Sequence, residues 1–258
     1  MLKPERPIVM TIAGHDPSGG AGIQADMEAI SYTDCHPVSV ISCLTVQDTR
    51  NVQRIQIVDP EFMLQQARTL LADMSIDVIK LGLLGSIETI EAVSQLLTEF
   101  PKIPVVFDPV LAAGGGTKLS TEQLISSIKE QLLPKITLLT PNTPEAIQLG
   151  IAEQNANNGA IFLGGQGCEN ILITGTHSDT EKVHNSLYCK GELVNQSSWK
   201  RLEHEYHGSG CTLASNIAGW LAHGFSLQYA VGKGQEFTWN SLKKAQQIGQ
   251  GQRIPYRI

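Results

Sequence analysis

PIVMTIAGHDPSGGAGIQADMEAISY, residues 7–32, sets a pattern that the chain then repeats. Residues 7–14 form an apolar run typical of a buried strand, and the residues from about Ala21 to Tyr32 have the spacing of a helix. A glycine-rich loop joins the two. A strand that leads directly into a helix is the first part of a βαβ unit, so this stretch predicts an α/β fold with parallel strands.

The same alternation continues to about residue 150. Further strands are expected at 38–46, 76–84, 104–110 and 136–142. One helix is expected at 60–74, and a second begins after Ser86, which can cap it. A third runs from a capping box formed by Ser120 and Gln123 to Leu133. A fourth begins with Thr143 as N-cap and Pro144 as the first helical residue. The 60–74 helix should turn one face to the core, with Phe62, Leu64, Ala67, Leu70 and Leu71.

The pattern loosens after residue 150. A strand is expected at 170–175, a hairpin of 184–190 and 192–202 around Gly191, and two helices at about 210–223 and 226–247, with Gly224 as the stop between them. There is no repeat and no linker. Residues 1–258 are therefore predicted to form one domain, with a mostly parallel central sheet covered by helices on both faces.

Composition and charge exclude several function classes. The 258 residues are 41% hydrophobic and 17% charged, which is typical of an ordinary globular protein. The net charge of −6, without a Lys/Arg cluster, argues against nucleic-acid binding. No run is long enough to span a bilayer, and the N-terminal residues do not resemble a secretory signal. Five scattered cysteines without a C-x-x-C pair fit a reducing cytoplasm, with neither disulfides nor a zinc site.

Several unusual residues follow strands and are expected at one edge of the sheet, where parallel α/β folds bind ligands. Residues 14–22, GHDPSGGAG, contain four glycines but match neither GxGxxG nor a P-loop, so a ligand loop and a plain connection both stay open. Asp108 ends another strand, and Asn142 and Glu145 flank a strand-to-helix turn. Such oxygen ligands suit Mg²⁺. The alternative for Glu145 is a first-turn acid that complements the helix dipole.

The stretch HGSGCTLAS, residues 207–215, places two glycines at the start of a helix held by Leu213, Ile217, Trp220 and Leu221. Exposed amides and the positive helix end predict an anion site. Cys211 would lie in that field, which lowers the pKa of a thiol, although a buried small hydrophobe is the commoner role of a free cysteine. His207 is either a base partner for Cys211 or a brace for the loop, and His15 is either near a ligand or solvated. The other cysteines, and His36, His184, His204 and His223, are read as structural.

Taken in order, six segments resemble hydroxymethylpyrimidine/phosphomethylpyrimidine kinases of thiamin biosynthesis, in the ribokinase-like superfamily. They are TIAGHDPSGGAGIQAD at 11–26, LTVQDT at 44–49, KLGLLGS at 80–86, FDPV at 107–110, LTPNTPEA at 139–146 and HGSGCTLAS at 207–215. The resemblance covers essentially the whole chain. It implies a three-layer α/β/α ribokinase-like fold, commonly a homodimer, and ATP- and Mg²⁺-dependent phosphorylation of the hydroxymethyl group of an aminopyrimidine and then of its monophosphate.

The resemblance also implies roles for individual residues. The pyrimidine-binding positions are Gly14, Ala21, Asp26 and Gln47, with Leu83 or Leu84 and Val110 as apolar walls. A side-chain amide such as that of Gln47 can both donate to and accept from an aminopyrimidine edge. Asp108, Asn142 and Glu145 match the Mg²⁺ and phosphate region, and Gly208, Ser209, Gly210 and Cys211 match the anion hole, with Cys211 in the position of the catalytic Asp of the related sugar kinases.

The chain departs from the family pattern in its second half. Where the family commonly has VKGGH, this sequence has ITGTH at 173–177, so that Thr174 replaces a lysine expected near the ATP phosphates. The usual acidic position is His184-Asn185, and residues 152–166 are short for the usual helix. These changes resemble a branch of the same family and are interpreted as subfamily variation.

Three other functions are weighed against this one. A pyridoxal/pyridoxine kinase has the same fold and takes a ring with a hydroxymethyl arm, whereas Gln47 and the DPSGGAG loop favour the pyrimidine. A thiol hydrolase would use Cys211 as nucleophile and would not need ATP. A non-catalytic pyrimidine sensor would explain Thr174 in place of lysine and would release no ADP.

Overall fold

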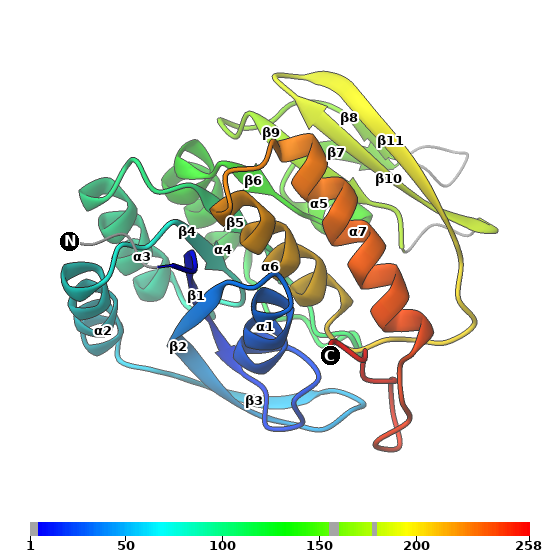
Figure 1. The fold of residues 1–258 in the computed structure, drawn as a ribbon, viewed down its shortest axis with the longest axis horizontal. Helices are drawn as coiled ribbons and strands as arrows, with labels where there is room; N and C mark the ends of the chain where they lie inside the picture. Colours follow the sequence, from blue (N-terminus) through cyan, green and yellow to red (C-terminus); the bar gives the residue numbers. More distant parts are fainter. Residues whose placement is uncertain (1–4, 155–159, 177–179) are drawn as a thin grey trace.

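The computed structural model describes residues 5–154, 160–176 and 180–258, which form helices on either side of a central sheet (Figure 1). Within these ranges, nine strands build one sheet in the order β11-β10-β9-β6-β5-β4-β1-β2-β3. The strands from β9 to β2 are parallel to one another. Antiparallel pairs add β3 at one edge and β10 and β11 at the other. The predicted α/β class with a mostly parallel sheet is therefore confirmed.

The strands are β1 Ile8–His15, β2 His36–Gln47, β3 Val52–Ile57, β4 Val78–Leu81, β5 Val105–Phe107, β6 Leu138–Leu139, β7 Ala152–Gln154, β8 Ala160–Phe162, β9 Asn170–Thr174, β10 Lys182–Cys189 and β11 Glu192–Lys200. The α-helices are α1 Gly22–Ser31, α2 Pro60–Asp73, α3 Ile87–Glu99, α4 Glu122–Ser127, α5 Thr143–Gln148, α6 Ser209–Ala222 and α7 Leu227–Lys243. A π-helical turn, Ile128–Leu132, and a 3₁₀ turn, Leu133–Lys135, continue α4.

Alternate side chains of the central strands point to opposite faces of the sheet, and each face has its own core. Ile8, Met10 and Ile12 of β1 pack with the buried faces of α2, α3 and α4. Val9 of the same strand packs with α1, α6 and α7, which lie together on the near face of the sheet in Figure 1. Burial on both faces explains why the central strands are mostly apolar along their length, with the buried Thr11 and Lys80 as exceptions.

Several local predictions hold and others need correction. Ser86 caps α3 as predicted, since its hydroxyl accepts from the Thr89 amide at 3.1 Å. The hairpin around Gly191 and the final two helices are also confirmed. Phe62 does not face the core: its side chain is 57% exposed. The predicted Leu64, Ala67 and Leu71 are buried, and Met63 takes the place of Phe62 on the buried face of α2.

Two helix starts are one residue away from their predicted positions. Thr121, and not Ser120, caps α4, because the Ser120 hydroxyl donates to the Leu111 carbonyl and is not available to the helix. Asn142, and not Thr143, caps α5, because its side chain reaches the Glu145 amide while Glu145 returns a bond to the Asn142 amide. In both cases a tertiary or reciprocal contact selects among neighbouring capping residues.

Two segments differ more from expectation. Strand β3 has no predicted counterpart, because VQRIQI is half polar and is an edge strand with one exposed side. In the region 152–166, β7 and β8 pair as a short antiparallel hairpin, and residues 155–159 between them lie outside the described residues. No helix within the described ranges is both long enough and apolar enough to cross a membrane.

The packing of α6 against the end of α1 gives a stability test. A Cβ on buried Gly219 would overlap the side chain of Thr33. Gly219→Ala is therefore expected to lower the free energy of unfolding by about 1–3 kcal/mol through overpacking, measured by urea unfolding. Alanine is intrinsically the better helix former by about 1 kcal/mol, so helix propensity alone predicts the opposite sign.

Gly232 provides the matched control. It lies in α7, is exposed, and has open space where a Cβ would be. Gly232→Ala should raise the free energy of unfolding by about 0.5–1 kcal/mol. Equal stabilisation by both substitutions would contradict the close approach of α6 to Thr33.

Candidate active site

A cavity of about 770 Å³ opens at the carboxyl ends of the parallel strands. Its volume lies in the upper part of the range for small-molecule sites. Almost all the residues singled out in the sequence line it, namely Gly14, His15, Ala21, Gln47, Leu83, Asp108, Val110, Asn142, Glu145, Thr174, His207, Gly208, Ser209, Gly210 and Cys211. Asp26 and Leu84 do not.

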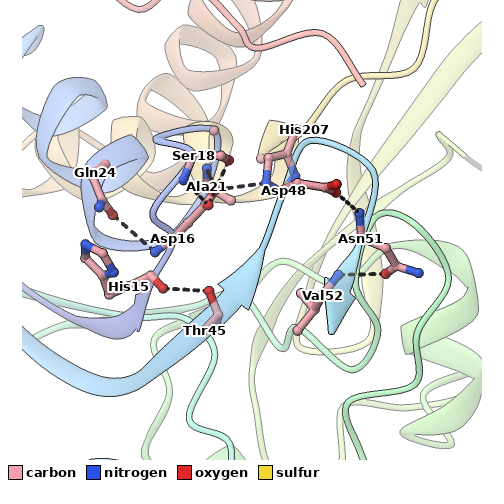
Figure 2. A network of polar contacts seen from close by, with 12 residues as sticks. His15, Asp16, Ser18, Ala21, Gln24, Thr45, Asp48, Asn51, Val52 and His207 are labelled. Carbon is pink, nitrogen blue, oxygen red and sulfur yellow. Dashed lines mark hydrogen bonds and ion pairs between the residues drawn. The ribbon is translucent and has the colours of Figure 1, made fainter. Parts of the chain in front are cut away.

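The loop between β1 and α1 is folded around the carboxylate of Asp16. One oxygen accepts from the amide and the hydroxyl of Ser18, and the other accepts from the Ala21 amide, each at 2.8 Å. The same second oxygen lies 2.8 Å from Nε2 of His207 (Figure 2). Burial opposes ionisation of Asp16, but the bonds from His207 and Ser18 outweigh it and lower its pKa. His207 therefore braces the loop.

The loop and the start of α6 touch backbone to backbone. Gly208 has a φ of +73°, in the left-handed region that favours glycine, and a Cβ on it would collide with the Gly20 carbonyl. A Cβ on Gly20 would in turn collide with the His207 ring. Because the first amides of a helix have no partner within the helix, residues 209–211 offer N–H groups and a positive helix end to the cavity.

Two carboxylates share this end of the cavity. A Cβ on Gly210 would lie 3.2 Å from Oδ2 of Asp108, so the Asp108 carboxylate is in contact with the first turn of α6. Burial raises the pKa of Asp108 to about 6, against the attraction of Lys80. Burial and repulsion from Asp108 raise the pKa of Glu145 to about 8. Glu145 is the capping acid of α5, and it also lines the cavity.

The expected low pKa of Cys211 is wrong. Complete burial raises the pKa of its thiol to about 12, and the nearby Asp108 and Asp26 carboxylates add to the increase, while Lys80 opposes it. Desolvation and two negative charges thus outweigh the field of the α6 N-terminus. The thiol is protonated at neutral pH and donates a hydrogen bond to Asp108.

Beneath the cavity lies a buried ion pair. Nζ of Lys80 is 2.7 Å from Oδ1 of Asp26, and neither side chain is exposed at all. Asp26 also accepts from the hydroxyls of Thr11, at 2.6 Å, and Ser215, at 2.7 Å. Although burial lowers the pKa of Lys80, attraction by the Asp26 and Asp108 carboxylates raises it overall, so the ammonium group is charged. Asp26, matched to a pyrimidine-binding position by resemblance, lies below the cavity floor.

The far end of the cavity is formed by the hairpin and α7. Oε1 of Gln235 accepts from the side chains of Asn185, Ser197 and Trp199 and so ties the hairpin to the helix. Trp199 and Trp239 both line the cavity, with ring centroids 6.2 Å apart. Thr174 is joined to the start of α5, since its carbonyl accepts from the Thr143 hydroxyl. His177, the last residue of the unusual ITGTH segment, lies outside the described residues.

Sequence reasoning missed Lys80, Gln235 and Trp199. A lysine in the middle of the apolar run IDVIKLGLL was a usable signal, because a lysine is almost never fully buried unless it is paired. Gln235 and Trp199 carry no such signal. They reach the cavity only because antiparallel pairing places β10 and β11 beside β9.

Comparison with known proteins gives one consistent family. A family profile described as "Phosphomethylpyrimidine kinase" matches residues 16–256. The hydroxymethylpyrimidine/phosphomethylpyrimidine kinase of Escherichia coli is 35% identical, over 81% of this chain and 80% of that protein. A thiamine biosynthesis bifunctional protein of Geobacter sulfurreducens is 37% identical over 94% of this chain. The chain spans about half the length of the bifunctional relatives it matches, between 47% and 50%.

Solved structures share the fold. A pyridoxal kinase from Bacillus subtilis, determined as an ADP complex, has a TM-score of 0.84 at 25% identity and covers 98% of each chain. A phosphomethylpyrimidine kinase from Clostridium difficile has a TM-score of 0.75 at 27% identity, over 90% of this chain and 98% of that one.

The buried pair beneath the site gives a second stability test. Lys80→Met leaves the Asp26 carboxylate buried without its counter-charge, and we expect it to lower the free energy of unfolding by about 3–5 kcal/mol. The double variant Lys80→Met/Asp26→Asn should recover most of that loss, since no buried charge is left over. Urea unfolding of the three proteins measures both effects.

The exposed pair of Lys233 and Glu236, 2.9 Å apart on α7, provides the control. Lys233→Met should change stability by less than about 1 kcal/mol. If Lys80→Met were as mild as Lys233→Met, the Asp26–Lys80 pair would not be the polar centre of this core.

Proposed function

The chain belongs to the phosphomethylpyrimidine kinase family, and we propose that it is an ATP-dependent kinase of an aminopyrimidine. It would phosphorylate the hydroxymethyl group of 4-amino-5-hydroxymethyl-2-methylpyrimidine and then convert the monophosphate to the diphosphate, for thiamin biosynthesis. The proposal is supported by one observation above others. A single cavity has a glycine-loop wall with the Gln47 amide beside it and, next to that wall, the N-terminus of α6.

The two ends of the cavity suit the two substrates. Gly14, Ala21 and Val110 leave a narrow apolar slot, and the Gln47 amide can pair with the ring nitrogens and amino group of the pyrimidine. Asn142, Thr174 and Glu145 also line the cavity, as do Trp199 and Trp239. Thr174 is bridged to Asn142 and pairs with Asn185 of the hairpin. We assign the phosphates of ATP to the group of Asn142, Thr174 and Glu145, and its base to the two tryptophans.

In the proposed transfer, the hydroxyl oxygen of the pyrimidine forms a bond to the γ-phosphorus while the bond to the ADP oxygen breaks. The transition state is loose, so alignment and neutralisation of charge dominate. The amides of Ser209, Gly210 and Cys211 face the transferring oxygens. Because the Cys211 thiol is protonated, we assign it the role of positioning the acceptor hydroxyl and the Asp108 carboxylate. The hydroxyl proton passes late to an oxygen of the transferred phosphoryl group, so the step needs no strong base.

Mg²⁺ fits the carboxylates at this end. Asp108 and Glu145 are buried oxygen donors whose repulsion raises the pKa of Glu145, and a divalent cation would relieve that repulsion. Among the described residues there is no cluster of three or more His, Cys, Asp or Glu side chains suited to a metal. The remaining ligands would thus be water and ATP phosphates. When bound, Mg²⁺ would neutralise charge on those phosphates.

We also propose a cytoplasmic homodimer. All five cysteines are free thiols, which supports a reducing compartment. The homodimer rests on the family resemblance, and light scattering measures it directly.

A nucleotide-coupled assay tests the activity. ADP release is expected when ATP and Mg²⁺ are mixed with the alcohol, and separately with its monophosphate. No ADP release with either pyrimidine would reject the kinase and leave the sensor. Pyridoxine is the comparison substrate, because a pyridoxal kinase is among the closely superimposable structures. Turnover of pyridoxine above that of the aminopyrimidine would favour the B6 salvage function instead.

Variants of Cys211 separate positioning from base catalysis. Cys211→Ser keeps a small hydrogen-bond donor next to Asp108, so kcat should fall less than about tenfold. A general base contributes about 10²–10⁴-fold. A loss of that size in Cys211→Ser, in a protein that still binds ATP, would identify the thiolate as the base.

A further inference from the structure

The closing strap, residues 246–257, runs back from the end of α7 to the two turns of the site (Figure 1). Gln246 and Ile254 form a two-way backbone bridge that folds the strap on itself. The Arg253 carbonyl then accepts from the His207 amide at 2.9 Å. This bond brings the strap to the residue that precedes Gly208.

Arg257 of the strap is buried against the glycine loop and the first turn of α6. Its side chain is fully buried, and its guanidinium group has three partners on three different elements. Nε donates to the Thr212 hydroxyl at 2.8 Å, and Nη2 donates to the Gly20 carbonyl. Nη1 is 3.1 Å from the carboxylate of Glu28 on α1, whose side chain is 42% exposed.

The first two partners belong to the two turns that meet at the cavity. The Thr212 hydroxyl also donates to the Gly208 carbonyl at 2.7 Å. Thr212 therefore links Arg257 to Gly208, the N-cap of α6. The Gly20 carbonyl is the atom against which Gly208 packs. The guanidinium group therefore holds both sides of the Gly20–Gly208 contact at once.

The ion pair with Glu28 does not by itself explain why Arg257 is buried. The free energy of desolvating a guanidinium group exceeds the attraction that a half-exposed carboxylate provides. Glu28 is such a partner and accounts for one of the three contacts. The other two are directed bonds to neutral oxygens at fixed positions. A planar fork of donors can reach both at once, whereas the point charge of a lysine cannot.

We propose that Arg257 is a positioning residue that fixes the distance between the glycine loop and the first turn of α6. If the proposed function holds, Arg257 thereby positions the acceptor hydroxyl relative to the phosphoryl-binding amides of α6. It does so without contacting either substrate. The Asp16–His207 contact joins the same two segments through side chains that line the cavity, whereas Arg257 does not line it. The two contacts together hold the glycine loop against the start of α6.

The test compares variants that remove different parts of this arrangement. Arg257→Lys keeps the charge but not the fork, and Arg257→Gln removes both. Glu28→Gln removes only the ion pair. Arg6→Gln is the matched control, because Arg6 donates to the Asp34 and Cys35 carbonyls and pairs with Asp34, before β1 and away from the cavity.

Both Arg257 variants are expected to lower kcat by about 10- to 100-fold, as a small misplacement of reacting groups does, with the KM for ATP changed less than about threefold. Glu28→Gln and Arg6→Gln should retain wild-type kcat. A wild-type kcat in folded Arg257→Lys overturns the proposal. An equal loss in Glu28→Gln also overturns it, since anchoring to α1 would then be the cause.

Thr212→Val provides a second route if the Arg257 variants do not fold. It keeps the shape of the side chain and removes the hydroxyl that links Arg257 to Gly208. The same fall in kcat is expected, and an unchanged kcat counts against the proposal.

Amide hydrogen exchange separates this proposal from the proposed function, because it needs no turnover. The amides of His207 and Thr212, which donate to the Arg253 and Gly208 carbonyls, should exchange faster in Arg257→Lys than in Glu28→Gln. If the wild-type protein turns over neither pyrimidine, the proposed function fails while exchange still tests Arg257. Equal exchange in the two variants would reject the positioning role whatever the substrate.

Discussion

The contact between the Gly20 carbonyl and Gly208 is the constraint on which the site depends. No side chain separates the two backbones, so the loop after β1 and the start of α6 lie as close as two chains can. Gly208 also needs a left-handed φ, which glycine adopts without strain. The glycines are thus needed because two segments almost 190 residues apart meet there, as the 191-residue separation of the neighbouring Asp16–His207 pair records.

Electrostatics supports the same junction from below. Lys80 is a buried cation that pairs with Asp26 and lies near Asp108 and Cys211, and it is held in the middle of a central strand. Its charge stabilises the Asp26 carboxylate directly and lowers the pKa of Asp108 against the effect of burial. The high pKa of the Cys211 thiol follows from the same surroundings, because two carboxylates and complete burial outweigh one ammonium group.

Much of the fold was predictable because it depends on short-range patterns. Apolar strand runs, the Ser86 cap and the Gly191 turn each act within a few residues, and each was assigned correctly. Predictions failed where tertiary contacts decided the outcome. Ser120 bonds to Leu111 and leaves the cap to Thr121, and Phe62 turns to solvent because another row of α2 fits the sheet. The half-polar edge strand β3 left no pattern strong enough to assign.

The sequence by itself determined the α/β class, the order of the central parallel strands with their helices, and which loops would collect at the carboxyl ends of those strands, because periodicity and parallel pairing are properties of the chain read in order. Only the tertiary structure decided that Asp26 lies under the cavity with Lys80, that Cys211 keeps its proton, and that Arg257 reaches Gly20 and Thr212. Those outcomes depend on burial and on distances between residues far apart in the chain. Neither burial nor such a distance can be derived from the spacing of residues along the sequence.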